Sequence, residues 1–293
     1  MDCRNITEPA PEVKDGKYLE KMFELQRDLM EGYIKIEGLP KPPLNVNSKS
    51  AQVVLKDMAS RSVEELAEGY ESTHLACEIM EKHGWNLQTL SEKEYRMLLN
   101  HLQNTNEEQA DATAFYLELL IYAGVNGDML REYALETCGE ELNPTVPLLD
   151  ALMFTGIKLI SEFNPLMHAV LEEMQRYKYS LLHPEMFDSE KEYEKAKEYI
   201  PGFRGLSPVS HHNEMSILWQ IEYHIGVGRN YLKNKPWKQT GELSDEDQYF
   251  SNLYQGICKL FGYHALMGLT PDGLYSIFWK KHCVNKFRQR SQY

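Results

Sequence analysis

Two short segments of the chain each place a pair of carboxylates on one side of a helix. In RSVEELAEGYES, Glu65 and Glu68 are three positions apart, and in NEEQADATAFYLELLIYAG, Glu108 and Asp111 have the same spacing. Side chains so spaced lie on one helical face, where like charges repel each other by a few tenths of a kcal/mol. A bound cation would convert that cost into a gain.

The second pair of acids lies at one end of an apolar stripe. Phe115, Leu119 and Tyr122 continue the face that Glu108 and Asp111 begin. A buried carboxylate is costly unless it is paired or bound to a metal. Two acid pairs on neighbouring helices would form an oxygen-rich cage suited to magnesium. The alternative from the residues alone is a solvated acidic face.

A third group of residues could grip an anion. Lys281, Asn285 and Arg288 are spaced i, i+4 and i+7, so one helical face presents all three. Arginine can form two parallel hydrogen bonds to phosphate oxygens, whereas lysine acts as a compact charge. The competing interpretation is a surface helix whose basic residues only balance an acidic protein.

These motifs together resemble the all-α nucleotide pyrophosphohydrolase superfamily, which includes the MazG proteins and the dimeric dUTPases. The EExxE and ExxD motifs of that superfamily match Glu64-Glu65-Leu66-Ala67-Glu68 and Glu108-Gln109-Ala110-Asp111. The stretch KHCVNKFRQ looks like the K-N-x-x-N-x-x-R-Q tail of the dimeric dUTPase branch, and NKPWKQ is similar to its K-x-W stretch. Two features depart from the pattern: His282 replaces an asparagine, and the K-x-W-like stretch follows the ExxD motif.

The resemblance implies a reaction and a role for each residue. It implies magnesium-dependent hydrolysis of dUTP or dCTP to the monophosphate and pyrophosphate, with two or more magnesium ions and a homodimeric enzyme. The metal ligands would be Glu65, Glu68, Glu108 and Asp111, and Glu64 would orient the attacking water or support the ligands. The substrate contacts would be Lys281, Asn285 and Arg288 at the phosphates, and Gln26, Trp237 and Lys238 elsewhere on the nucleotide, with Gln26 and Trp237 at the base or ribose.

Two other functions stay open at this point. The first is a broader nucleoside triphosphate pyrophosphohydrolase of the MazG type, and the second is a non-catalytic helical protein that binds nucleotides. Retention of the four acids and of the Lys/Asn/Arg tail favours an enzyme. No Walker loop or dinucleotide glycine fingerprint is found in the sequence.

Composition narrows the class of protein. Hydrophobic residues make up 42% of the 293 residues, which is enough for a large core, yet no apolar run approaches the ~18 residues of a membrane span. A net charge of −13 disfavours nucleic acid as a partner. The polar N-terminus and five scattered cysteines without a CxxC pair predict reduced thiols in the cytoplasm.

The elements that must position these residues are helices. We expect one all-α multi-helix bundle, with the acid motifs in 17–143, an inserted helical and loop region in 144–212, and the phosphate-binding tail in 213–293. The spacing of Trp219, Tyr223 and Tyr231 predicts that they belong to the core. Apolar spacing and turn residues predict helices at about 17–36, 51–83 with a break at Gly69, 106–124, 150–182, 213–233, 245–268 and from Pro271 onward.

Overall fold

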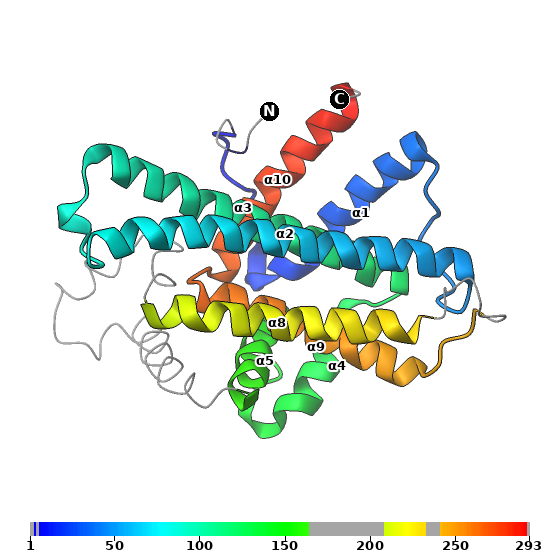
Figure 1. The fold of residues 1–293 in the computed structure, drawn as a ribbon. Helices are drawn as coiled ribbons and strands as arrows, with labels where there is room; N and C mark the ends of the chain where they lie inside the picture. The colour runs from blue at the N-terminus through cyan, green and yellow to red at the C-terminus, as the bar shows by residue number, and fades with distance from the viewer. Residues whose placement is uncertain (1–2, 4–5, 164–207, 233–240, 292–293) are drawn as a thin grey trace.

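The computed structural model describes residues 3, 6–163, 208–232 and 241–291. Within these residues the chain is built from helices, with no strand, so the predicted all-α bundle is confirmed (Figure 1). The α-helices are α1 (Tyr18–Glu37), α2 (Lys49–Lys82), α3 (Glu92–Ala123), α4 (Gly127–Cys138), α5 (Leu148–Phe163), α8 (Pro208–Tyr231), α9 (Glu246–Leu266) and α10 (Pro271–Ser291).

Helices α2 and α3 form a long antiparallel hairpin, which lies across the middle of the molecule in Figure 1. The Ser62 hydroxyl donates to the carbonyl of Ala112 at 3.0 Å, and the hydroxyls of Thr73 and Thr105 lie 3.2 Å apart. These small side chains let the two backbones approach closely. The predicted break at Gly69 is wrong, because α2 continues through this residue while packed against α3.

The start of α3 lies well before the expected position near residue 106. Ser91 accepts a hydrogen bond from the backbone N–H of Glu94, and the Glu94 carboxylate accepts one from the backbone N–H of Ser91. This reciprocal cap satisfies two N–H groups that the first turn would otherwise leave free. The first turns of α3 are mostly polar and bury only Leu98 and Leu102, which explains why apolar periodicity missed them. The predicted end is confirmed, since Gly124 takes the left-handed conformation with φ +81.

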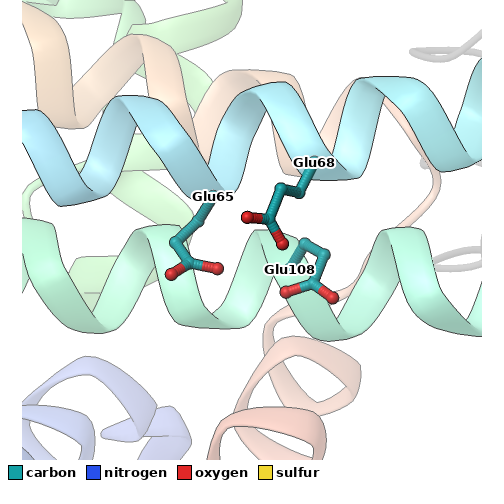
Figure 2. Close-up of side chains that lie close together, drawn as sticks. All are labelled: Glu65, Glu68 and Glu108. Carbon is teal, nitrogen blue, oxygen red and sulfur yellow. The ribbon is translucent and has the colours of Figure 1, made fainter.

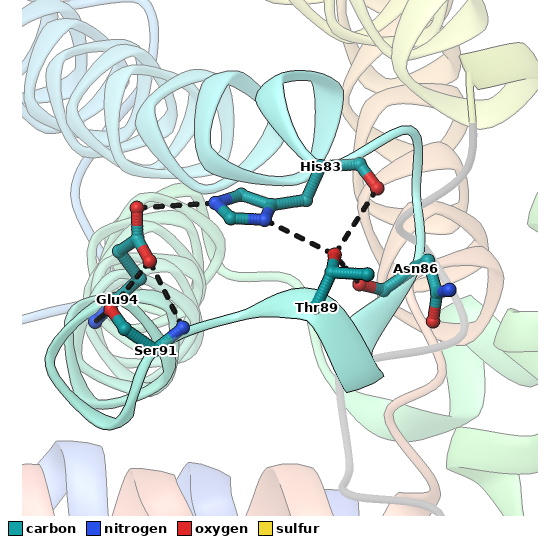
Figure 3. Close-up of polar contacts among 5 residues, drawn as sticks. All are labelled: His83, Asn86, Thr89, Ser91 and Glu94. Carbon is teal, nitrogen blue, oxygen red and sulfur yellow. Dashed lines mark hydrogen bonds and ion pairs between the residues drawn. The ribbon is translucent and has the colours of Figure 1, made fainter.

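His83 forms hydrogen bonds to two residues across the turn between α2 and α3 (Figure 3). Its Nε2 lies 3.1 Å from the Glu94 carboxylate and its Nδ1 lies 3.1 Å from the Thr89 hydroxyl. Hydrogen bonds from Ser91, followed by one from His83, lower the pKa of Glu94 to about 2. The turn therefore holds the two helices in register, and with them the acid pairs that they carry.

A second pair of helices, α8 and α9, covers the hairpin on one side (Figure 1). Helix α8 contacts α2, and α9 contacts both α3 and α5. The backbones of α5 and α9 come into direct contact at Gly156, where an added Cβ atom would overlap the carbonyl of Cys258. Helix α4 was not predicted from the sequence. The expected helix to residue 182 is described only as far as Phe163.

The aromatic residues of α8 do not all belong to the core. The side chains of Trp219 and Tyr223 are 65% and 52% exposed, so their predicted burial is wrong, whereas Tyr231 is partly buried. The helix instead turns another face toward α2 and α9, which buries Ile217, Leu218, Ile221 and Ile225. No helix within the described ranges is long and apolar enough to cross a bilayer.

Helices α1 and α10 run parallel to each other and project from the same side of the hairpin (Figure 1). The Lys286 ammonium forms an ion pair with Asp28 at 2.8 Å, and the Gln289 amide donates to the carbonyl of Leu29 at 2.8 Å. A Cβ atom on Gly32 would overlap the side chain of Gln289, so this close approach depends on glycine. These contacts fix which face of α10 points toward α3.

Candidate metal and phosphate site

Three of the predicted metal ligands converge between α2 and α3 (Figure 2). Carboxylate oxygens of Glu65, Glu68 and Glu108 all lie within 4.8 Å of one another. Glu65 and Glu108 are partly buried, whereas Glu68 is exposed. A donor set made only of carboxylate oxygens suits a hard divalent cation such as magnesium. The residues present therefore fit the metal that the sequence pattern predicts.

The electrostatics of this acid cluster (Glu65, Glu68 and Glu108) indicate an excess of negative charge. Burial, followed by the charges of Asp111, Glu108 and Glu68, raises the pKa of Glu65 to about 8. Burial also raises the pKa of Glu108, although the nearby Lys281 ammonium opposes this shift. A carboxyl group that resists ionisation in a cluster of like charges is stabilised as an anion by a bound cation.

Asp111, the fourth predicted ligand, pairs with a cation. The ammonium of Lys281 on α10 forms an ion pair with the Asp111 carboxylate, and the two side chains are 18% and 19% exposed. Burial raises the pKa of Asp111, and the charges of Lys281 and Arg288 partly offset the rise. Burial alone would lower the pKa of Lys281, but Asp111 and then Glu108 raise it above its ordinary value. Lys281 therefore stays charged beside the cluster.

The predicted phosphate-binding face of α10 is directed toward this side of α3. Arg288 is exposed and donates from Nη1 to the Asn285 side-chain oxygen at 3.3 Å. The charge of Arg288 lowers the pKa of Asp111, as the charge of Lys281 does. Thus Lys281, Asn285 and Arg288 line one face, while His282 and Lys286 on another face pair with α1 through Asp28.

Gln26 occupies a different place from the residues that are predicted to bind phosphate. It lies on α1 with a side chain only 2% exposed, and its Nε2 donates to Oε1 of Glu118 on α3 at 2.7 Å. Burial raises the pKa of Glu118 to about 7, while the Gln26 hydrogen bond and the Arg61 charge oppose the shift. Sequence reasoning missed Glu118, although it lies seven positions after Asp111 and so returns to the same helical face.

The three remaining predicted site residues are Glu64, Trp237 and Lys238. Glu64 lies on α2 next to Glu65, and its side chain is exposed and outside the group of three converging carboxylates. Trp237 and Lys238 lie outside the described residues.

A buried polar network supports the opposite side of α3. The Tyr263 hydroxyl donates to the Glu214 carboxylate at 2.6 Å, and the Gln109 amide donates to the Tyr263 oxygen at 3.3 Å. The Thr113 hydroxyl and His264 Nε2 lie 2.7 Å apart. Because Gln109 is adjacent to Glu108, this network restrains the rotation of α3 about its axis.

The site thus joins three carboxylates that fit a divalent cation, a partly buried lysine–aspartate pair, an arginine on the same helix as the lysine, and a partly buried Gln–Glu pair farther along α3. In comparisons with models of known families, with curated proteins and with solved structures, no match to the chain is found.

Proposed function

We propose that the chain hydrolyses a pyrimidine deoxynucleoside triphosphate, dUTP or dCTP, to the monophosphate and pyrophosphate in the presence of magnesium. The observation that carries this proposal is the convergence of Glu65, Glu68 and Glu108 within 4.8 Å, beside the Lys281–Asp111 pair. A metal-binding group next to a buried cation is the arrangement that a triphosphate needs, because its charge must be neutralised along its length.

The acids would hold magnesium, and Asp111 would join them as Lys281 turns to a phosphate oxygen. Bound magnesium supplies charge neutralisation and a more acidic water molecule. Glu64, exposed beside Glu65, would orient that water. Hydrolysis would break the phosphoanhydride link between the α and β phosphates: the oxygen of water would bond to one phosphorus, the bridging oxygen would stay on the other, and the proton would pass to solvent.

The basic face of α10 would stabilise the departing pyrophosphate. Lys281 offers a charge that is already partly buried, and Arg288 offers a planar pair of donors that its 3.3 Å hydrogen bond to Asn285 orients. Preorganised donors cost little reorganisation at the moment of reaction, so they stabilise the transition state more than solvent can.

Assembly and location belong to the same proposal. A homodimer follows from the resemblance to the dimeric dUTPases, and light scattering of the purified chain measures it. A cytoplasmic location agrees with the five cysteines, all of which are free thiols.

The experiment that tests the activity uses the full chain with magnesium and a panel of ribonucleoside and deoxyribonucleoside triphosphates. Pyrophosphate and orthophosphate are measured separately. We expect pyrophosphate and a monophosphate from dUTP or dCTP. Release of orthophosphate alone, or no turnover of any pyrimidine deoxynucleoside triphosphate, would contradict the proposal.

A matched pair of variants ties the activity to the cluster. Glu68→Gln removes one charge from the converging carboxylates, and Glu71→Gln removes the same charge from an exposed position one turn along α2. We expect Glu68→Gln to abolish turnover and Glu71→Gln to leave it near the wild-type rate. Binding of a nucleotide without turnover by the wild-type chain would instead indicate a non-catalytic nucleotide-binding protein.

A further inference from the structure

Gln26, which is buried, and Glu118, which is partly buried, form a polar contact between α1 and α3. Gln26 is 2% exposed, and its amide donates to Glu118 at 2.7 Å. A neutral amide is a weak partner for a partly buried carboxyl group, which costs free energy unless it is well paired. A carboxyl group whose pKa is shifted by burial is common at sites that bind a ligand.

Glu118 lies on the same face of α3 as Asp111, farther along the helix than the acid cluster. Glu118 follows Asp111 by seven residues, so it lies about 10.5 Å farther along the α3 axis and within about 20° of the same direction. That displacement is comparable to the distance between the phosphates and the base of a nucleotide. Glu108 of the acid cluster lies ten residues before Glu118, about 15 Å away along the same axis. A triphosphate whose phosphates lie beside Asp111 and Lys281 and whose length follows α3 would bring its base near Glu118.

The charges of Glu118 and Arg288 both act on Tyr33 of α1. Burial, followed by the charge of Glu118, raises the pKa of Tyr33, and the charge of Arg288 opposes the rise. Arg288 also acts on the pKa of Asp111. Tyr33 on α1 thus lies near both Glu118 and the arginine of the phosphate-binding face.

The hydrogen-bonding groups of Gln26 and Glu118 would distinguish cytosine from uracil. Gln26 is almost fully buried and its Nε2 donates to Oε1 of Glu118, so the group left for a ligand is the partly exposed carboxyl group of Glu118. Carbonyl and carboxylate oxygens accept hydrogen bonds. The exocyclic amino group of cytosine donates to such acceptors, whereas uracil presents a carbonyl oxygen at the same position.

We propose that Glu118, held in place by Gln26, recognises the exocyclic amino group of a cytosine base, so that dCTP is the preferred substrate over dUTP. This inference rests on the proposed function and resolves the choice between its two substrates. A contact of this kind is worth roughly a tenfold to hundredfold preference in kcat/KM.

The test compares kcat/KM for dCTP, dUTP and dATP, with magnesium, in the wild-type chain and in Glu118→Gln. The wild-type chain should prefer dCTP over the other two. In Glu118→Gln the new amide can donate to the uracil carbonyl, so we expect the value for dCTP to fall roughly tenfold to a hundredfold and the preference to disappear or reverse. Glu37→Gln is the matched control, because it removes a nearby but exposed carboxylate charge whose influence reaches Glu118.

A second measurement needs no variant, in case Glu118→Gln does not fold. The triphosphate of 2-pyrimidinone deoxyriboside retains the cytosine ring but lacks its amino group, and it should lose the same factor relative to dCTP in the wild-type chain. Three outcomes would overturn the role of Glu118 and leave the proposed function standing. They are equal turnover of dCTP and this analogue, a preference of the wild-type chain for dUTP or dATP, and an unchanged preference in a folded Glu118→Gln variant. Absence of turnover with every triphosphate would overturn the proposed function itself.

Discussion

Lys281 on α10 forms an ion pair with Asp111 on α3, and each side chain keeps less than a fifth of its surface exposed. The pair brings a cation from the C-terminal helix to the acids carried by the central hairpin. Removing one member of a buried pair leaves the other charge without compensation, which is more costly than the net value of the pair. The contact therefore links the stability of α10 to the chemistry proposed for the site.

Replacing Lys281 with methionine should impair both turnover and stability. We expect the rate to fall roughly 10²–10³-fold, as for the loss of one preorganised donor. We expect the free energy of unfolding to fall by about 1–3 kcal/mol, since the pair is only partly buried. Steady-state assays and urea denaturation measure the two effects. Lys280→Met, which removes the same charge at the adjacent position, should change both much less, and equal losses in the two variants would argue against a specific role for Lys281.

The two arginines near the end of α10 provide the next comparison. Both Arg288 and Arg290 are exposed, but about 200° of helical rotation separates them, so only one can point toward the acids. Arg288→Ala should lower kcat roughly 10²–10³-fold if it grips phosphate oxygens, whereas Arg290→Ala should have little effect. Equal and mild losses would favour the interpretation that these residues only balance surface charge.

Removing a charge from the acid cluster should stabilise the chain when no metal is present. Glu68→Gln relieves repulsion with Glu65 and Glu108, so its melting temperature in a chelating buffer should exceed that of the wild-type chain by a few degrees. Adding magnesium should then raise the melting temperature of the wild-type chain more than that of the variant, because the metal stabilises the folded state that binds it. Thermal scans with and without magnesium measure both shifts. An equal response to magnesium in the two proteins would remove Glu68 from the metal site.

The buried Glu214 should make stability depend on pH. Burial raises its pKa from 4.5 to about 7, against the opposing effect of the Tyr263 hydrogen bond. Because the folded state holds the proton more tightly than the unfolded state, the favourable contribution is complete below pH 4.5 and is lost as the pH rises through 7. Glu214→Gln cannot titrate, so its stability relative to the wild-type chain should rise between pH 5 and pH 8 by up to about 3 kcal/mol.

Denaturation at a series of pH values measures this difference. Glu136→Gln, at an exposed position of α4, is the control and should follow the wild-type curve. Parallel curves for Glu214→Gln and the wild-type chain would mean that Glu214 ionises with an ordinary pKa in the folded protein.

Local patterns in the sequence determined much of the helical structure. Apolar spacing located α1 within one residue at each end, and Gly124 marked the end of α3. The spacing of Glu65 with Glu68, and of Glu108 with Asp111, placed each pair on one helical face before any contact between helices was known. These features depend on residues within a few turns of one another, and helical periodicity is a local property.

Contacts between helices decided the rest. Periodicity identified a helix around Trp219 and Tyr223 but not which of its faces would be buried, and the packing of α8 on α2 and α9 left both aromatic side chains in solvent. No spacing joins Gln26 to Glu118, or Lys281 to Asp111, since each pair spans two helices that are distant in the chain. The partner of a buried charge depends on which helices lie against each other, and that is settled only when the whole core packs.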